Sequence, residues 1–189
     1  KNDANTDFVI NGGPFYTTTH YALVNYDKAT INGGTFNGSL WNSTGVAGVG
    51  ELTIKNGEFN PTVGTGKDLI INGSAGTVSI SGGTFSNEVS AEYCAEGFLP
   101  IANANGTYGV TDEPLAITPN RTSQSGAGAV TLTVTPAGLT ADVEVTCGIE
   151  SVTLTDNGDG TWTTSRLPNT TATYTFTVKA GETEATCTV

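Results

Sequence analysis

Residues 9–15 read VINGGPF, and close variants of this phrase return as TINGGTF at 30–36, TIKNGEF at 53–59 and SISGGTF at 79–85. The four phrases end in Phe15, Phe36, Phe59 and Phe85, which are spaced by 21, 23 and 26 residues. Repeats of this period are supersecondary units that cannot bury an apolar face alone and must stack on one another. Each phrase predicts a short strand, then a tight corner at Gly-Gly or Asn-Gly where a side chain would collide, then an aromatic that points into the stack.

A second strand is expected before the second, third and fourth phrases, over 22–26, 45–51 and 68–71. Two to three short strands per repeat, with Gly, Asn or Pro at the corners, are typical of one coil of a parallel β-helix, whose coils stack about 4.8 Å apart. A leucine-rich repeat would need an L-x-x-L-x-L pattern, which is missing, and a propeller blade would need roughly 40 residues.

One row of each coil must point inward, and two rows compete for that role. The inward row is formed either by Val9, Thr30 and Thr53 or by the isoleucines that follow them. We favour the isoleucines because one apolar residue type then continues through all four coils. The favoured inward rows are Ile10, Ile31, Ile54 and Ile80, with Phe15, Phe36, Phe59 and Phe85 behind them. Asn11 and Asn32 follow the first two of these isoleucines and predict an amide ladder of two rungs, which Lys55 ends.

The C-terminal end of the stack is expected to be covered. Residues 87–96 predict a short helix with Asn87 as N-cap and Gly97 at the C′ position. Residues 99–110 then predict two strands around Asn105-Gly106, a strong hairpin signal. Such a cover prevents edge-to-edge association of exposed strands. The N-terminal end lacks one, so we expect a processed or excised piece of a longer chain.

A second domain is predicted after Asp112-Glu113-Pro114, where the periodicity changes and Pro interrupts strand pairing. The predicted domains are therefore 1–111, a capped parallel β-helix, and 112–189. The later part alternates strictly and places on one face Leu115, Ile117, Val130, Leu132, Val134, Val143, Val145, Cys147, Val152, Leu154, Trp162, Tyr174, Phe176, Val178, Ala185, Cys187 and Val189. About seven such strands predict an antiparallel sandwich of immunoglobulin type, so the fold class is all-β.

The composition excludes several classes of function. Seven Lys plus Arg against eighteen Asp plus Glu give a net charge of −11, which repels nucleic acid and anionic membranes. Abundant Gly, Thr, Asn and Ser suit strands and turns. No apolar stretch approaches the roughly 18 residues of a membrane span, and no signal peptide opens the chain.

The phrase I-x-G-G-T-F, followed by EYCAEGF at 92–98 and then by NGTY at 105–108, resembles the solenoid repeats of large surface and secreted proteins, and the cap segment 81–110 is its most specific stretch. Such proteins come from gut-dwelling Gram-positive bacteria and their phages. Residues 152–181 look like the bacterial immunoglobulin-like modules strung along the same proteins. The resemblance covers nearly the whole chain and implies a β-helix, a sandwich and an extracellular setting, but no catalytic residue.

Three features of the chain are candidate sites, two in the second domain and one in the first. Cys147 and Cys187 share an apolar face, which favours a disulfide worth roughly 3–4 kcal/mol over two buried free thiols. The run 156–160 (DNGDG) resembles a calcium loop, but the EF-hand spacing would put Thr155 and Arg166 at ligand positions, so a hairpin turn is favoured. His20 is the sole histidine and no C-x-x-C occurs, so neither a metal nor another cofactor is expected.

Enzymatic activity is not expected. The basic residues of the first domain are four lysines, Lys1, Lys28, Lys55 and Lys67, and its coil carboxylates, Asp27, Glu51, Glu58 and Asp68, recur at no common coil position. A β-helix hydrolase or lyase needs acid and base groups that converge. A glycan-binding platform is the sharper alternative, built from the loop and corner aromatics Trp41, Tyr16, Tyr21 and Tyr26.

The sequence therefore predicts a non-catalytic extracellular stalk or spacer of a bacterial cell-surface protein. Its partners would be neighbouring domains or copies, with no nucleic acid and no membrane insertion. Two alternatives stay open. One is an adhesin module that binds glycans, and the other is a phage fibre or self-assembling appendage in which the first coil docks on another copy.

Overall fold

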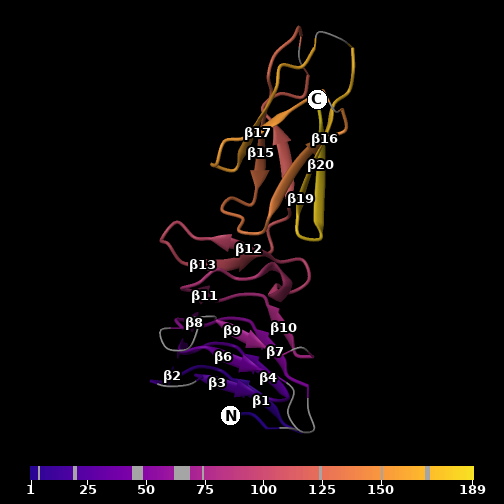
Figure 1. The fold of residues 1–189 in the computed structure, drawn as a ribbon. Coiled ribbons are helices and arrows are strands. Elements are labelled where there is room, and N and C mark those ends of the chain that lie inside the picture. Colours follow the sequence, from indigo (N-terminus) through magenta and orange to yellow (C-terminus); the bar gives the residue numbers. More distant parts are fainter. Residues whose placement is uncertain are drawn as a thin grey trace. The chain divides into compact units, whose positions relative to one another are not determined.

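The computed structural model describes residues 1–3, 5–18, 21–43, 49–61, 69–73, 75–123, 125–149, 151–168 and 171–189. The described residues form strands with a single turn of 3-10 helix, and several of the sheets are parallel, which confirms the all-β class. The chain divides into a first unit, Lys1–Asp112, and a second unit, Glu113–Val189 (Figure 1). This division lies one residue beyond the boundary expected from the sequence.

Three parallel sheets run through the first unit, and each takes one strand from successive repeats (Figure 1). The first sheet contains β1 (Asp7–Ile10), β4 (Lys28–Ile31), β7 (Glu51–Ile54) and β10 (Thr77–Ile80). The second contains β2 (Pro14–Tyr16), β5 (Thr35–Asn37), β8 (Glu58–Phe59) and β11 (Thr84–Phe85). The third contains β3 (Leu23–Asn25), β6 (Leu40–Asn42) and β9 (Ile70–Asn72).

The favoured inward rows are confirmed by the strand register. Ile10, Ile31, Ile54 and Ile80 occupy matched positions of the first sheet and are all buried. The four phenylalanines occupy matched positions of the second sheet, and their rings stack with centroids 4.6, 5.1 and 4.9 Å apart. The competing residue Val9 is half exposed. Stacked apolar rows of this kind bury a continuous core that no single repeat could form alone.

The glycine two residues before each phenylalanine makes the corner between the first two sheets. Gly34, Gly57 and Gly83 all have positive φ, the left-handed region that side chains rarely adopt. A Cβ on Gly34 would lie 2.9 Å from the carbonyl oxygen of Gly13 in the preceding repeat. The collision predicted from the sequence is therefore with the backbone of the repeat beneath.

A ladder of asparagines that was not predicted from the sequence joins the strands of the third sheet, and Asn2, Asn25 and Asn42 in it are buried. Asn2 Nδ2 donates to Asn25 Oδ1 at 2.7 Å, Asn25 Nδ2 to Asn42 Oδ1 at 2.8 Å, and Asn42 Nδ2 to Asn72 Oδ1 at 2.8 Å. The predicted pair also forms, since Asn32 Nδ2 donates to Asn11 Oδ1 at 2.8 Å, but that bond is exposed. The principal ladder has four rungs and lies inside the stack.

Of the three strands predicted before the later phrases, one is placed differently in the structure and two are found close to their predicted positions. The strand of the third sheet in the second repeat is β6, at Leu40–Asn42, rather than the predicted 45–51, of which 45–48 lie outside the described residues. Its neighbours β3 and β9 overlap the predicted 22–26 and 68–71.

The predicted helix over 87–96 is wrong, while the hairpin after it is confirmed. Only η1 (Ala91–Tyr93) is helical, and its N-cap is Ser90 instead of Asn87. Val89 is buried in the core and Ala95 N donates to Ile80 O at 2.8 Å, so this segment must stay extended on both sides of the turn. Beyond it, β12 (Leu99–Ala102) and β13 (Tyr108–Thr111) pair, and β13 adds antiparallel to the edge of β11.

Seven strands in two antiparallel sheets make up the described part of the second unit. One sheet has the order β14 (Ala116–Pro119), β15 (Thr131–Thr135), β18 (Thr161–Thr164), β17 (Leu154–Asp156). The other has the order β16 (Val143–Cys147), β19 (Thr175–Ala180), β20 (Thr183–Thr188). The alternation read from the sequence holds, because the predicted inward residues Leu132, Phe176 and Val178 are wholly buried.

Candidate functional site

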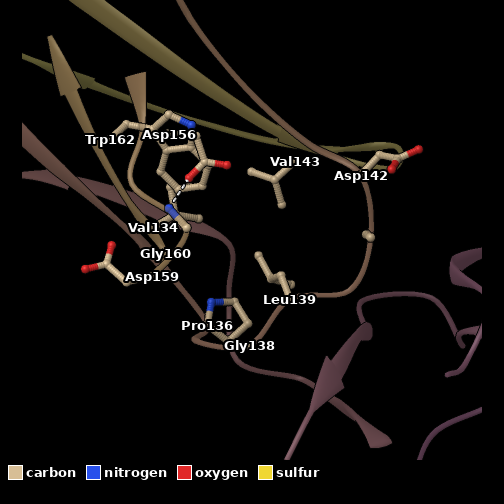
Figure 2. A pocket seen from close by; sticks show the side chains of 12 residues that line it. Val134, Pro136, Gly138, Leu139, Asp142, Val143, Asp156, Asp159, Gly160 and Trp162 are labelled. Carbon is tan, nitrogen blue, oxygen red and sulfur yellow. Dashed lines mark hydrogen bonds between the residues drawn. The ribbon is translucent and has the colours of Figure 1, made fainter. Parts of the chain in front are cut away.

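The second unit contains a cleft of about 530 Å³ between the segment that joins β15 to β16 and the turn that joins β17 to β18 (Figure 2). Its buried floor is apolar and is formed by Val134, Pro136 and Trp162, of which Trp162 is 8% exposed. Leu139 and Val143 are half-buried and line the side nearer β16. A volume of this size lies within the roughly 300–1,000 Å³ of small-ligand sites.

Three carboxylates stand at the rim of the cleft, and all three residues are exposed. Asp156 and Asp159 belong to the β17–β18 turn, and Asp142 precedes β16 on the other side (Figure 2). None of the described residues that line the cleft is basic. Hydrogen bonds from the hydroxyl and backbone N–H of Thr161 hold the pKa of the Asp159 carboxyl below its ordinary value, so this carboxylate stays ionised at neutral pH.

The local sequence explains why this turn presents its carboxylates outward. Gly158 and Gly160 have φ of 75° and 81°, which other residues rarely adopt. Asp156 Oδ1 accepts a 2.8 Å hydrogen bond from Gly158 N, and Asp159 Oδ1 accepts a 3.0 Å bond from Thr161 N. The hairpin interpretation of 156–160 is confirmed, since β17 and β18 pair directly across it.

The β17–β18 turn was predicted from the sequence, but the cleft that it borders was not. Nothing in the order of residues indicated that Asp142, fourteen positions before Asp156, would lie across from it. The joining of Leu139, Val143 and Trp162 depends on how two sheets pack, which alternation alone does not specify. The one feature of the sequence that could have pointed to the cleft is the close spacing of two acidic residues, Asp156 and Asp159.

The four aromatic residues proposed as a glycan platform do not all contact one another in the structure. Tyr16 lies on β2 and is 71% exposed, while Tyr21 packs edge-on against Trp41 of β6 with centroids 4.8 Å apart. The Lys1 ammonium lies 5.2 Å from the ring centroid of Tyr26. Trp41 is half-buried, and its indole N–H is buried with no hydrogen-bond partner in the described part of the chain. Among described residues, only Tyr21 and Trp41 contact each other as a ring pair within this set.

The structure does not join the two cysteines expected to form a disulfide. Cys147, Cys187 and Cys94 are free thiols. Cys147 and Cys187 both pair with Phe176, from β16 on one side and β20 on the other. Two strand spacings separate them by about 9.5 Å, whereas a disulfide requires Cα atoms within about 7 Å.

A second cleft of about 520 Å³ lies in the first unit beside β9, under the segment that carries η1. Leu69, Ile70 and Val89 give it an apolar interior, and Glu88 and Glu92 line it as well. The third sheet ends here at its third strand, β9. The segment before η1 passes β9 without pairing with it, and the cleft lies between them.

The residues considered for catalysis are not brought together by any described contact. Glu51 pairs with Lys28 at 3.5 Å, and Glu58 accepts a hydrogen bond from Thr35 at 3.4 Å, so both link neighbouring repeats. His20, Lys67 and Asp68 lie outside the described residues. Within the described ranges, no group of three or more His, Cys, Asp or Glu could hold a metal ion.

Comparison with known proteins finds no match to this chain among protein-family models, curated proteins or solved structures. No helix of the described residues has the length and apolar character needed to cross a membrane. The function must therefore be argued from the architecture and the clefts.

Proposed function

We propose that the chain is a non-catalytic extracellular module, a stalk or spacer of a bacterial cell-surface protein. In this proposal the first unit is a short right-handed parallel β-helix of four coils, capped by the β12–β13 hairpin, and the second unit is an immunoglobulin-like sandwich. The right hand follows from the general handedness of parallel crossovers. The extracellular setting rests on the resemblance of the repeats and the later strands to bacterial surface proteins.

The observation that carries the proposal is the continuity of the rows inside the first unit. The stacked rings of Phe15, Phe36, Phe59 and Phe85 and the four asparagines of the ladder tie every repeat to the next. Nearest-neighbour contacts of this kind turn a chain of short strands into a rod. The hairpin extends the second sheet beyond β11 by two antiparallel strands, so that β12 is the edge strand at that end.

Force spectroscopy tests the spacer function. The chain is stretched between handles at its two ends, and the first unit is expected to resist as a cooperative body and to unfold in a discrete event. Asn42→Ala, which removes a buried rung, should lower the unfolding force, whereas the exposed Asn32→Ala should leave it nearly unchanged. Gradual extension of the wild-type unit without a discrete event would remove the basis for a spacer.

The contact between Tyr21 and Trp41 favours glycan binding as a second candidate. Half-buried paired rings on the outside of a coil provide a small platform on which a sugar face could stack. A glycan array run with and without calcium tests it, with Trp41→Ala as the loss variant and Tyr16→Ala as the control outside the pair. A blank array, or a hit that survives Trp41→Ala, would remove this platform as a site.

The first coil favours self-assembly as a third candidate. Phe8 is 41% exposed although its partners in the same row, Ala29 and Leu52, are buried. An apolar edge strand is a template for pairing with another chain. Sedimentation equilibrium over a range of concentrations tests it, with Phe8→Ser as the variant expected to lower association. A wild-type protein that stays monomeric at high concentration would contradict it.

A further inference from the structure

The cleft of the second unit combines an apolar interior with an anionic rim, and this combination restricts what it can bind. Trp162, Val134 and Pro136 are buried at its floor, so the apolar surface that a ligand can contact comes mainly from the half-buried Leu139 and Val143. Asp142 lines the rim on one side and Asp156 and Asp159 on the other, and Figure 2 shows the carboxylates of Asp142 and Asp159 directed outward from the cleft. A ligand that fits both surfaces is therefore apolar in its stem and positively charged at its head.

The rim charges are not neutralised by the protein itself. None of the three carboxylates forms an ion pair with another described residue, and the chain as a whole carries a net charge of −11. Clustered charge of one sign beside low-dielectric walls concentrates the electrostatic field and attracts ligands of the opposite sign. Charge complementarity thus selects a cation.

The cation is organic and not a metal ion. Within the described ranges, no group of three or more His, Cys, Asp or Glu could hold a metal ion, and these three carboxylates are included in that result. Asp156 and Asp159 already use one oxygen each to hold the turn, which leaves the remaining lone pairs for a donor from outside. Lysine and arginine side chains have the required form, because their methylene stems bury against apolar surface while the charged head stays at the rim.

We propose that this cleft binds an arginine or lysine side chain that projects from a partner polypeptide. The guanidinium or ammonium group donates hydrogen bonds to Asp156 and Asp159, with Asp142 on the opposite side of the rim. The methylene stem lies against Leu139 and Val143 and above the Trp162 floor. Arginine is the better ligand, because its planar group can bond two carboxylates at once.

The test uses the whole chain and amide chemical shifts, which detect millimolar binding. The probe is the capped peptide acetyl-Gly-Arg-Gly-amide, and its matched control replaces Arg by citrulline, which has nearly the same shape but no charge. The arginine peptide is expected to shift the Gly158, Gly160 and Val143 amides and the Trp162 indole signal, while the citrulline peptide leaves them in place. Equal shifts with both peptides, or none with either, would overturn the proposal.

Variants separate charge from folding. The double variant Asp156→Asn/Asp159→Asn keeps the oxygen acceptors of the turn, and we expect it to weaken arginine-peptide binding about tenfold, since it removes two charge-assisted hydrogen bonds. Asp142→Asn is the second variant, because the Asp142 carboxylate makes no hydrogen bond with other described residues and its loss leaves the fold alone. Asp7→Asn on β1 is the charge-matched control and should bind like wild type. Unchanged affinity in both cleft variants would overturn the proposal.

A third probe distinguishes a polypeptide partner from a free organic cation. n-Butylguanidinium carries the guanidinium and stem of arginine with neither a peptide backbone nor a second charge. We expect it to bind more weakly than the peptide, because the peptide backbone adds contacts along the exposed β17–β18 turn. If n-butylguanidinium binds as tightly as the peptide, the cleft is a site for small organic cations and the proposed partner is wrong.

Discussion

Asn25 Nδ2 donates a 2.8 Å hydrogen bond to Asn42 Oδ1, and both asparagine side chains are completely buried. Each amide also donates to backbone carbonyls of its own and the next repeat, as Asn25 does to Asp27 O and Glu51 O. Buried polar groups are expensive unless their hydrogen bonds are made, and here the amides make them with the repeat above. The ladder therefore fixes which strand of one repeat lies on which strand of the next.

Replacing Asn42 by alanine should destabilise the first unit by about 3 kcal/mol or more, because several buried groups lose their partners together. The Asn42 amide donates to Gly50 O, Asn72 Oδ1 and Thr77 O. Urea denaturation measures the change in the free energy of unfolding. The control is Asn32→Ala, whose ladder bond to Asn11 is exposed and should be worth about 1 kcal/mol or less. Equal losses in the two variants would contradict the importance of burial.

Gly57→Ala should destabilise the same unit by about 1–3 kcal/mol, the usual cost of a side chain in a sparsely populated backbone region. Its φ is 134°, and an added Cβ would lie 3.0 Å from Gly34 O and 3.1 Å from the ring of Phe59. Gly12→Ala is the matched control, since a Cβ there meets nothing within 4 Å. Thermal denaturation compares the two variants, and a Gly57→Ala protein as stable as Gly12→Ala would show that the corner can relax.

Phe59→Ala should cost about 3–5 kcal/mol, the range for deleting a fully buried aromatic. Its ring is wholly buried and stacks on Phe36 and Phe85 at 5.1 and 4.9 Å. Phe15→Ala should cost clearly less, because Phe15 is half-buried and stacks on Phe36 alone among the described phenylalanines. Urea denaturation of both variants gives the difference, and a larger loss in Phe15→Ala would mean that the end of the stack carries more stability than its middle.

The rows that were predicted and the ladder that was missed differ in one respect, the constancy of spacing. Ile and Phe lie five residues apart in every repeat, so their alignment is visible in the sequence. Asn25 precedes Ile31 by six residues, Asn42 precedes Ile54 by twelve and Asn72 precedes Ile80 by eight. Loops of variable length between the third sheet and the first therefore hide a ladder whose register is fixed in space.

The cleft residues could not be predicted for a related reason. Pairing within a sheet follows from alternation and turns, which identified the β17–β18 hairpin around Asn157-Gly158. The approach of Leu139 to Trp162 depends on packing between sheets. The disulfide prediction failed because Cys147 and Cys187 share a face of one sheet, with Phe176 between them, instead of facing each other across the core.

The thiols provide a direct test of that sheet register. Ellman's reagent should titrate all three cysteines in denaturant without prior reduction, because the structure holds each as a free thiol. A reducing agent should leave the melting temperature unchanged, since it has no disulfide to break. A titre of one thiol, together with a melting temperature that falls on reduction, would mean that Cys147 and Cys187 are bonded and that β16, β19 and β20 are arranged differently.

Alkylation of Cys94 should depend on pH in a way that reports how far its thiol is buried. Burial raises the pKa of the Cys94 thiol from an ordinary value of 9.0 to about 11, and the thiolate is the form that reacts. In a Cys147→Ala/Cys187→Ala protein, the native rate with iodoacetamide should keep rising up to about pH 11, whereas the denatured rate should level off near 9. Because the folded state keeps its proton longer, this thiol contributes stability that is fully present below pH 9 and is lost as the pH rises towards 11. A native profile that levels off near 9 would mean that the segment around η1 leaves Cys94 open to solvent.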